Sequence, residues 1–198
     1  MKNRRTQKSA LMQALGLIFA LSVLVSTNTQ AQTGDHWIYL PLIMALEPTP
    51  EPECNLNSQE QALADFMRDD PNQQRPSLRC DPILAQVARE RALDMGNRNY
   101  FSHVNLNGYG PNYLVQQAGY SLPSFYGQEP TANNIESISA GRSSVEATWT
   151  GWMNSDGHRT HILGLQPFWA EQTDYGIGYA YVPGSTYGYY WVVITARH

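Results

Sequence analysis

Apolar side chains recur at helical spacing in the first half of the predicted domain, before any strand-like segment appears. Between residues 62 and 67 they follow the i, i+3, i+4 pattern, directly after Ser58-x-x-Gln61, which has the form of a capping box. The pattern predicts a helix that begins near Ser58. It should end at Asp70-Pro71, because a proline disfavours helical geometry in the residue before it.

Two further helices are predicted by their end signals. Asp81 is placed as an N-cap and Pro82 as the first helical residue, and an apolar face then continues to about Asn97. A shorter apolar repeat over residues 113–118 is closed by Gly119. Residues 121–134 show turn residues without a period, which indicates a loop.

The last third of the chain changes from helical to strand-like patterning. Ser143 or Ser144 can cap a helix that continues through Trp152. Residues 175–182 and 187–196 are rich in aromatic and β-branched side chains, and Pro183-Gly184-Ser185-Thr186 joins them as a hairpin. Helices first and strands last favour an α+β fold with an antiparallel sheet covered by helices, and they do not fit a βαβ repeat.

The N-terminal residues 1–31 have the pattern of a secretory signal peptide. A basic head precedes an apolar run of 16 residues, Ala10–Val25, and Thr29-Gln30-Ala31 offers a small residue for cleavage. A retained membrane anchor is the alternative, but a span needs about 20 apolar residues. We therefore expect export and cleavage, with no transmembrane segment left in the mature chain.

Residues 32–53 are predicted to precede the folded domain, which we place at 54–198. Trp37–Leu46 is an apolar patch too short to span a bilayer, and it can be a strand, a pre-linker or a surface-association element. In Glu47–Glu53, every second residue is proline, which excludes a helix and predicts a stiff, extended linker.

The net charge and the two cysteines limit the classes of partner and the cellular compartment that we expect. Without its first 31 residues the chain keeps nine arginines against 17 acidic residues, a net charge of −8, which argues against nucleic acid and anionic membrane as partners. Export makes a disulfide between the only two cysteines, Cys54 and Cys80, the expected state. Such a link would stabilise the fold by about 3.5 kcal/mol. A two-cysteine metal site is the weaker alternative, because no histidine stands beside either cysteine.

Three separate segments carry the candidate chemistry. A turn of small residues, Asn154-Ser155-Asp156-Gly157, stands directly before His158, and the other two segments contain His103 and Glu136. Two imidazoles and one carboxylate form a sufficient ligand set for zinc with an open position, although each residue can equally be structural. The sequence contains no His-Glu-x-x-His, no Gly-x-Ser-x-Gly and no phosphate-binding loop.

These segments, in this order, resemble the CAP superfamily, also called the SCP-like or cysteine-rich secretory, antigen 5 and pathogenesis-related-1 family. The similarity covers about residues 55–198. It is carried by four stretches: Asp94-Met95 through Tyr100-Phe101-Ser102-His103; Ala118-Gly119-Tyr120; Glu136-Ser137-Ile138-Ser139-Ala140-Gly141; and Trp152-Met153-Asn154-Ser155-Asp156-Gly157-His158-Arg159. Gly176-Ile177-Gly178 and Tyr190-Trp191 are similar to its closing strands.

The resemblance implies a three-layer α-β-α sandwich with a central antiparallel sheet and a surface cleft. His103, Glu136 and His158 would line that cleft and hold a divalent metal such as zinc. A second set of residues would line the cleft beside them: Asn154, Ser155 and His161. The alternatives are a turn or helix-cap role for Ser155 and a packing or surface position for His161.

Five positions depart from the family pattern. Ile135 stands in place of a glycine and Ser137 in place of an asparagine, so the segment around Glu136 can sit differently. Other replacements are Tyr113 for an arginine, Ser155 for a second acid found in eukaryotic members, and His161 for an asparagine.

The function that we expect is that of a secreted, monomeric, non-catalytic module whose cleft binds a divalent metal, a lipid-like small ligand or an extracellular partner. The alternative is a metal-dependent, peptidase-like hydrolase that uses His103, Glu136 and His158. A third interpretation is an envelope-associated structural protein, tethered by an uncleaved N-terminus or by Trp37–Leu46.

Overall fold

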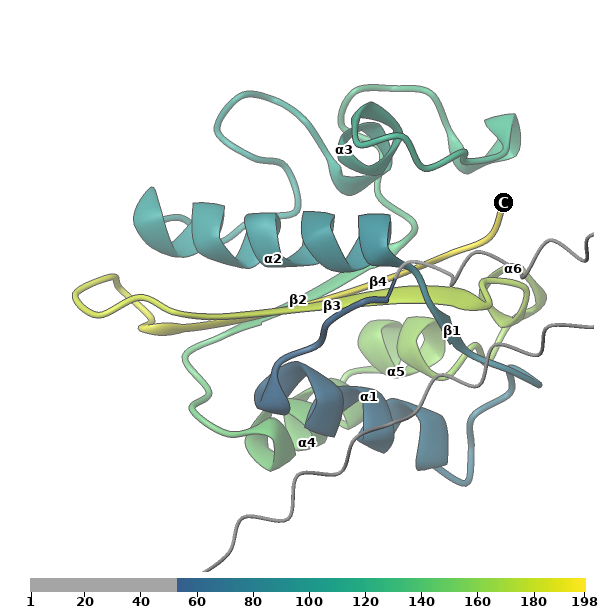
Figure 1. Ribbon diagram of the computed structural model, residues 1–198, viewed down its shortest axis with the longest axis horizontal. Helices are drawn as coiled ribbons and strands as arrows, with labels where there is room; N and C mark the ends of the chain where they lie inside the picture. The colour runs from purple at the N-terminus through teal and green to yellow at the C-terminus, as the bar shows by residue number, and fades with distance from the viewer. Residues whose placement is uncertain (1–52) are drawn as a thin grey trace, which may run out of the picture. The chain divides into compact units, whose positions relative to one another are not determined.

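A four-stranded sheet lies at the centre of the computed structural model, which describes residues 53–198, and helices cover both of its faces (Figure 1). The expected signal peptide, the apolar patch and nearly all of the linker lie outside the described residues. The strands run in the order β1-β3-β4-β2. Their bounds are Arg79–Cys80 for β1, Glu136–Ala140 for β2, Asp174–Tyr181 for β3 and Tyr189–Ala196 for β4.

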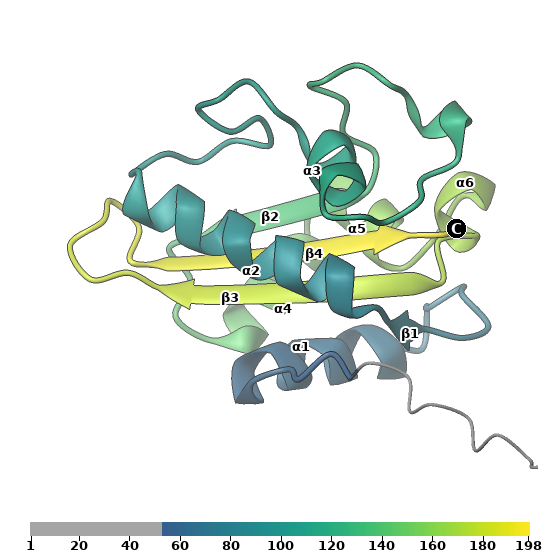
Figure 2. The same ribbon diagram turned by 45° about the horizontal axis from the view of Figure 1, so that its top comes forward.

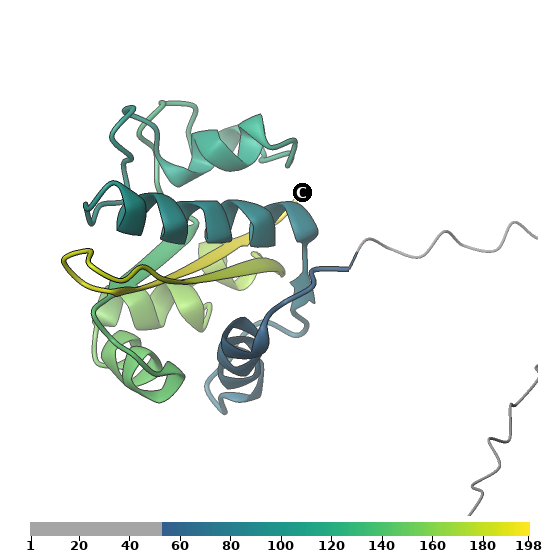
Figure 3. The same cartoon turned by 60° about the vertical axis from the view of Figure 1, so that its left-hand side comes forward.

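The helices form two layers, as expected for an α-β-α sandwich. Helices α2 and α3 lie on one face of the sheet, and α1, α4 and α5 lie on the other (Figures 1 and 3). The helices are α1 (Ser58–Asp69), α2 (Pro82–Asn97), α3 (Pro111–Gln117), α4 (Val145–Met153), α5 (Asp156–Ile162) and α6 (Pro167–Ala170). A 3₁₀ turn, Ser124–Tyr126, is the one helical element in the predicted 121–134 loop.

Strand β4 divides the core between the two faces by its period-two alternation. Val192 and Ile194 belong to the cluster under α2 and α3, whereas Trp191 and Val193 belong to the cluster on the α1, α4 and α5 side. All four are buried. The continuous apolar run in this strand is therefore explained by a helical layer on each side.

Helix α2 lies unusually close to the sheet. Figure 2 shows it crossing over β3 and β4. Gly176 and Gly178 of β3 permit this approach, because an added Cβ would lie 2.1 Å from the Leu84 carbonyl carbon and 2.2 Å from that of Ala88. The two glycines thus fix the helix that supplies part of the site described below.

The start signals of α2 and α4 were read correctly, but the predicted turn Asn154-Ser155-Asp156-Gly157 contains the first two residues of α5. Asp81 accepts the backbone N–H groups of α2, as predicted. The cap of α1 was assigned wrongly, because Asn57 rather than Ser58 accepts the first N–H groups and Glu60 completes the capping box. The sequence motif was displaced by one residue because Ser58-x-x-Gln61 and Asn57-x-x-Glu60 satisfy the same pattern.

The sheet contains more than the predicted hairpin. Strands β3 and β4 pair antiparallel, and β2 pairs antiparallel with β4 from Glu136 opposite Ile194. The short β1 pairs with β3 in parallel, with Cys80 opposite Tyr175. The predicted disulfide is present and joins Cys54 to Cys80, so the segment before α1 is tied to the sheet edge. No helix within residues 53–198 is long and apolar enough to cross a membrane.

Candidate functional site

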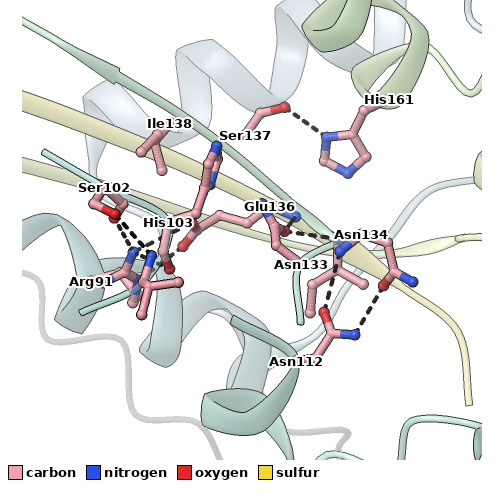
Figure 4. Close-up of polar contacts among 12 residues, drawn as sticks. Arg91, Ser102, His103, Asn112, Asn133, Asn134, Glu136, Ser137, Ile138 and His161 are labelled. Atoms are coloured by element: carbon pink, nitrogen blue, oxygen red, sulfur yellow. Dashed lines mark hydrogen bonds and ion pairs between the residues drawn. The ribbon is translucent and has the colours of Figure 1, made fainter. Parts of the chain in front are cut away.

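The side chain of Glu136, the first residue of β2, contacts Arg91 and His103. Its carboxylate accepts Arg91 Nε at 2.9 Å and lies 2.8 Å from His103 Nδ1 (Figure 4). Its side chain is fully buried, and its backbone N–H donates to Asn133 Oδ1. A carboxylate paired with arginine only accepts hydrogen bonds, so His103 carries its proton on Nδ1 and leaves Nε2 bare.

Arg91 connects helix α2 to the loop that carries His103. Its guanidinium donates to Tyr100 Oη at 2.8 Å and to the carbonyl oxygens of Ser102 and His103 at 2.7 and 3.0 Å. Desolvation alone would lower its pKa, but the charge and hydrogen bonds of Glu136 outweigh it and hold the Arg91 pKa above its usual range. The loop conformation of His103 is therefore set by a charged residue inside the core.

His158 lies in the first turn of α5, next to the cap residue of that helix. Its Nδ1 is 2.8 Å from Ser155 Oγ, and its ring centroid is 6.4 Å from that of Trp152. Desolvation lowers the pKa of His158, and the charge of Arg142 lowers it further, so the ring is neutral at pH 7.

A hollow of about 310 Å³ opens beside His158. Its walls come from the loop after α2, from β2, from α4 and α5 and from the β3–β4 hairpin. The residues that line it are Phe101, Ile138, Ser139, Ala140, Arg142, Gly151, Trp152, Ser155, His158 and Tyr187. Ser155 and His158 line this hollow, whereas His103, Glu136 and Asn154 are not among its lining residues. Asn154 is an exposed C-cap of α4.

His161 lies inside the protein and not at the cleft. It is 5% exposed, and its Nδ1 lies 2.7 Å from Ser137 Oγ (Figure 4). Its Nε2 lies 2.8 Å from Thr195 Oγ1. Desolvation, followed by the charge of Arg75, lowers its pKa to about 3. His161 and Ser137 both depart from the family pattern, and each stands in place of an asparagine. Because the two side chains contact each other, the larger side chain at position 161 packs against a smaller one at position 137.

His103 and Glu136 are in contact, and His158 lines the hollow to which Phe101, two residues before His103, also contributes. The three residues do not form one converged set of ligand atoms. Within residues 53–198, ligand atoms of three such groups come within 4.8 Å of one another at Asp81, Asp174 and His198. There, the Asp174 carboxylate already accepts hydrogen bonds from Arg79 Nε and Tyr120 Oη.

His103 and His158 each keep one ring nitrogen without a protein partner within residues 53–198, which is the donor that a metal ion would need. Both Nδ1 atoms are engaged by side-chain oxygens, while neither Nε2 has a hydrogen-bond partner among the described residues. A metal-bound histidine in proteins donates its second ring N–H to a carboxylate or other acceptor in this way. The assignment of a metal to this site stays a prediction.

Arg91 is the residue of this site that sequence reasoning missed. It stands on the apolar face of the helix predicted over residues 82–97 and was not named as a site residue. A charged side chain at a core-facing position requires a buried partner, and that requirement was the available signal. The partner itself, Glu136, lies 45 positions away, so the pair could not be assigned from local pattern.

Comparison with known proteins places these features in a wider group. Residues 66–195 match the family model described as CAP, cysteine-rich secretory protein family. The uncharacterized protein YkwD of Bacillus subtilis is 32% identical over 102 residues, which span 52% of this chain and 34% of that protein. The chain thus corresponds to about a third of that relative.

Two solved structures share the fold. An extracellular protein containing a SCP domain from Bacillus anthracis superposes with a TM-score of 0.51 at 24% identity, over 71% of this chain and 40% of that chain. An outer surface protein from Borrelia burgdorferi superposes with a TM-score of 0.52 at 16% identity, over 72% of this chain and 97% of that chain.

Proposed function

Because the chain belongs to the cysteine-rich secretory protein family, we propose that it is a secreted, non-catalytic module whose cleft holds a divalent metal ion between His103 and His158. The disulfide and the extracellular SCP-domain structure that shares the fold support an extracellular location. The cleft is then a binding surface for a small ligand or an extracellular partner.

The observation that carries the metal proposal is the orientation of the two imidazoles. Each Nδ1 is 2.8 Å from a side-chain oxygen, that of Glu136 for His103 and that of Ser155 for His158. Both Nε2 atoms therefore remain for a ligand, and nitrogen ligands of this kind suit zinc. A bound ion would supply a positive, Lewis-acidic centre in the cleft.

Glu136 has the role of orienting His103 in this proposal, rather than that of a third ligand. Its two oxygens are occupied by Arg91 and His103, and its side chain has no exposed surface. A carboxylate in that position fixes the tautomer and the direction of the ring and strengthens the imidazole as a ligand.

The same burial favours binding over hydrolysis. A hydrolase of the metal-dependent type needs a carboxylate that can accept a proton from water in the cleft. Glu136 is paired with a guanidinium and shielded from solvent, so it is poorly placed to act as that base. Ser155 contacts His158, but Nε2 of that ring has no acidic partner among residues 53–198.

Zinc titration by calorimetry tests the proposal, with chelator-treated protein at pH 7.5. We expect one site, an affinity decrease of more than about 100-fold in His158→Ala and a smaller decrease of about 10–100-fold in Glu136→Gln. His198→Ala is the matched control, because His198 belongs to the other cluster of possible ligands. Its affinity should equal that of the unaltered chain.

Two results would contradict the proposal. Loss of zinc binding in His198→Ala with retention in His158→Ala would move the site to the Asp81 and Asp174 cluster. Cleavage of a peptide library that disappears in His158→Ala, with the fold intact, would favour the metal-dependent hydrolase.

A further inference from the structure

Arg142 differs from the other arginines of residues 53–198 in its charge environment. Residues 53–198 contain nine arginines, and seven of them pair with a carboxylate. Of the two that do not, Arg142 is exposed to solvent. Arg75 also has no acidic partner, but it is buried and donates to the carbonyl oxygens of His161 and Ile162. The paired ones are Arg68, Arg79, Arg89, Arg91, Arg98, Arg159 and Arg197.

The side chain and the backbone of Arg142 both make contacts in the wall of this hollow. Its Nη1 donates to Ser139 Oγ at 3.1 Å, and its backbone carbonyl accepts Trp191 Nε1 at 2.8 Å. The side chain lies directly over Gly151 of α4, where an added Cβ would be 2.6 Å from Arg142 Cζ. An arginine that is already ordered loses less entropy when it binds an anion.

The hollow around Arg142 contains no acidic side chain. Its lining residues include one guanidinium and one imidazole, but neither aspartate nor glutamate. The larger hollow of about 510 Å³ beside α2 is different, because Glu90 and Asp94 accompany Arg91 and Arg98 there. On a chain with more acidic than basic residues, an acid-free hollow with an unpaired arginine favours an anionic ligand.

An aromatic pair stands at the same hollow. Phe101 and Tyr187 have ring centroids 5.7 Å apart and are 42% and 44% exposed. They come from the loop after α2 and from the β3–β4 hairpin, and both line the hollow together with Arg142. Exposed aromatic faces beside a charged group suit a ligand with an apolar body and one polar end.

We propose that this hollow binds a small carboxylate with an apolar body, which pairs its charged group with Arg142 and packs its body against Phe101 and Tyr187. The planar guanidinium can donate two parallel hydrogen bonds to such a group. This inference rests on the proposed function, since it names the ligand class of the same cleft.

Nuclear magnetic resonance titration with phenylacetate and with the neutral phenylacetamide tests this inference. The protein is chelator-treated, so that a metal ion cannot act as the receptor, and the titration is carried out at pH 7.5 and constant ionic strength. We expect phenylacetate to bind about tenfold more tightly than phenylacetamide, a difference of about 1.4 kcal/mol, because only the anion makes a charge-assisted hydrogen bond with the guanidinium. The backbone amide signals of Ser139, Arg142 and Gly151 should shift.

Two variants and one control locate the effect. Arg142→Gln should remove the preference for the anion, and Gly151→Ala should weaken it because the added methyl group displaces the guanidinium. Arg68→Gln is the matched control, since Arg68 is also exposed but lies on α1 and pairs with Asp65 and Asp69. Its preference should remain about tenfold.

Each other outcome overturns the inference, but not always the proposed function. Equal binding of the two probes, or a preference that survives in Arg142→Gln, would show that the cleft binds ligands without recognising charge. Failure of both probes to shift any cleft signal would overturn the ligand-binding part of the proposed function as well. Zinc binding is measured separately and is independent of either result.

Discussion

Removal of one partner from the Arg91–Glu136 pair should destabilise the fold strongly. The Arg91 side chain is 3% exposed and that of Glu136 is fully buried, so Glu136→Gln leaves an uncompensated charge in the core. Breaking a buried pair in this way costs about 3–5 kcal/mol. Arg91 would keep its hydrogen bonds to Tyr100, Ser102 and His103, so we expect a loss near the lower end, about 3 kcal/mol.

Urea unfolding of the oxidised protein measures this loss as a change in the free energy of unfolding. In a thermal scan it corresponds to a decrease in Tm of about 6–12 °C. Arg91→Met should destabilise by a comparable amount, because the carboxylate is then left without its guanidinium. The double variant Arg91→Met/Glu136→Gln removes both charges and should be less unstable than the sum of the single variants by at least about 2 kcal/mol.

An exposed pair serves as the control for this experiment. Arg68→Met breaks the contacts of a fully exposed guanidinium with Asp65 and Asp69, and it should leave the free energy of unfolding unchanged within error. The reasoning would be refuted if Glu136→Gln cost less than about 1 kcal/mol, or if the double variant were as unstable as the summed singles.

Three further predictions concern the scaffold. Reduction of the Cys54–Cys80 disulfide, which spans 26 positions, should lower the free energy of unfolding by about 3.5 kcal/mol in urea, and an unchanged midpoint would contradict this. Gly176→Ala should destabilise by about 3 kcal/mol because its Cβ would meet the backbone of α2, whereas Gly157→Ala, with nothing within 4 Å, should not. Since burial holds the pKa of His161 at about 3, below that of the unfolded chain, stability should be complete above about pH 6.5 and decrease toward pH 3 by up to about 1.4 kcal/mol per pH unit. His161→Gln should reduce that slope, and an equal slope in both proteins would contradict the assignment of this pH dependence to His161.

The elements that local chemistry defines were predictable from the sequence. The Asp81-Pro82 start of α2, the Gly119 stop after α3 and the hairpin that forms β3 and β4 all follow from residues within one or two turns of each other. Strand β2 was recognised only as a segment around Glu136, because its five residues contain a single β-branched side chain, Ile138, and show no strand pattern until they pair with β4. Its register depends on a partner more than 50 positions away.

The site was predictable in its members but not in their contacts. The motifs identified His103, Glu136 and His158, and the structure places His103 in contact with Glu136. The motifs could not show that Arg91 pairs with the Glu136 carboxylate. The pair joins helix α2 to strand β2, and the two residues meet only when the tertiary fold brings these elements together. The hydrogen bonds that bury His161 could not be assigned from the sequence either, because its partners Ser137 and Thr195 come from two different strands.

The central proposal, that His103 and His158 together bind a divalent ion through Nε2, is tested most directly by long-range ¹H–¹⁵N spectroscopy of the imidazole rings. Before metal is added at pH 7.5, His103 should show a protonated Nδ1 and a bare Nε2, because Glu136 accepts from Nδ1. One equivalent of zinc should then shift the Nε2 signals of His103 and His158 and leave those of His161 and His198 unchanged. A protonated Nε2 on His103, or a zinc-dependent shift at His198 instead, would contradict the account.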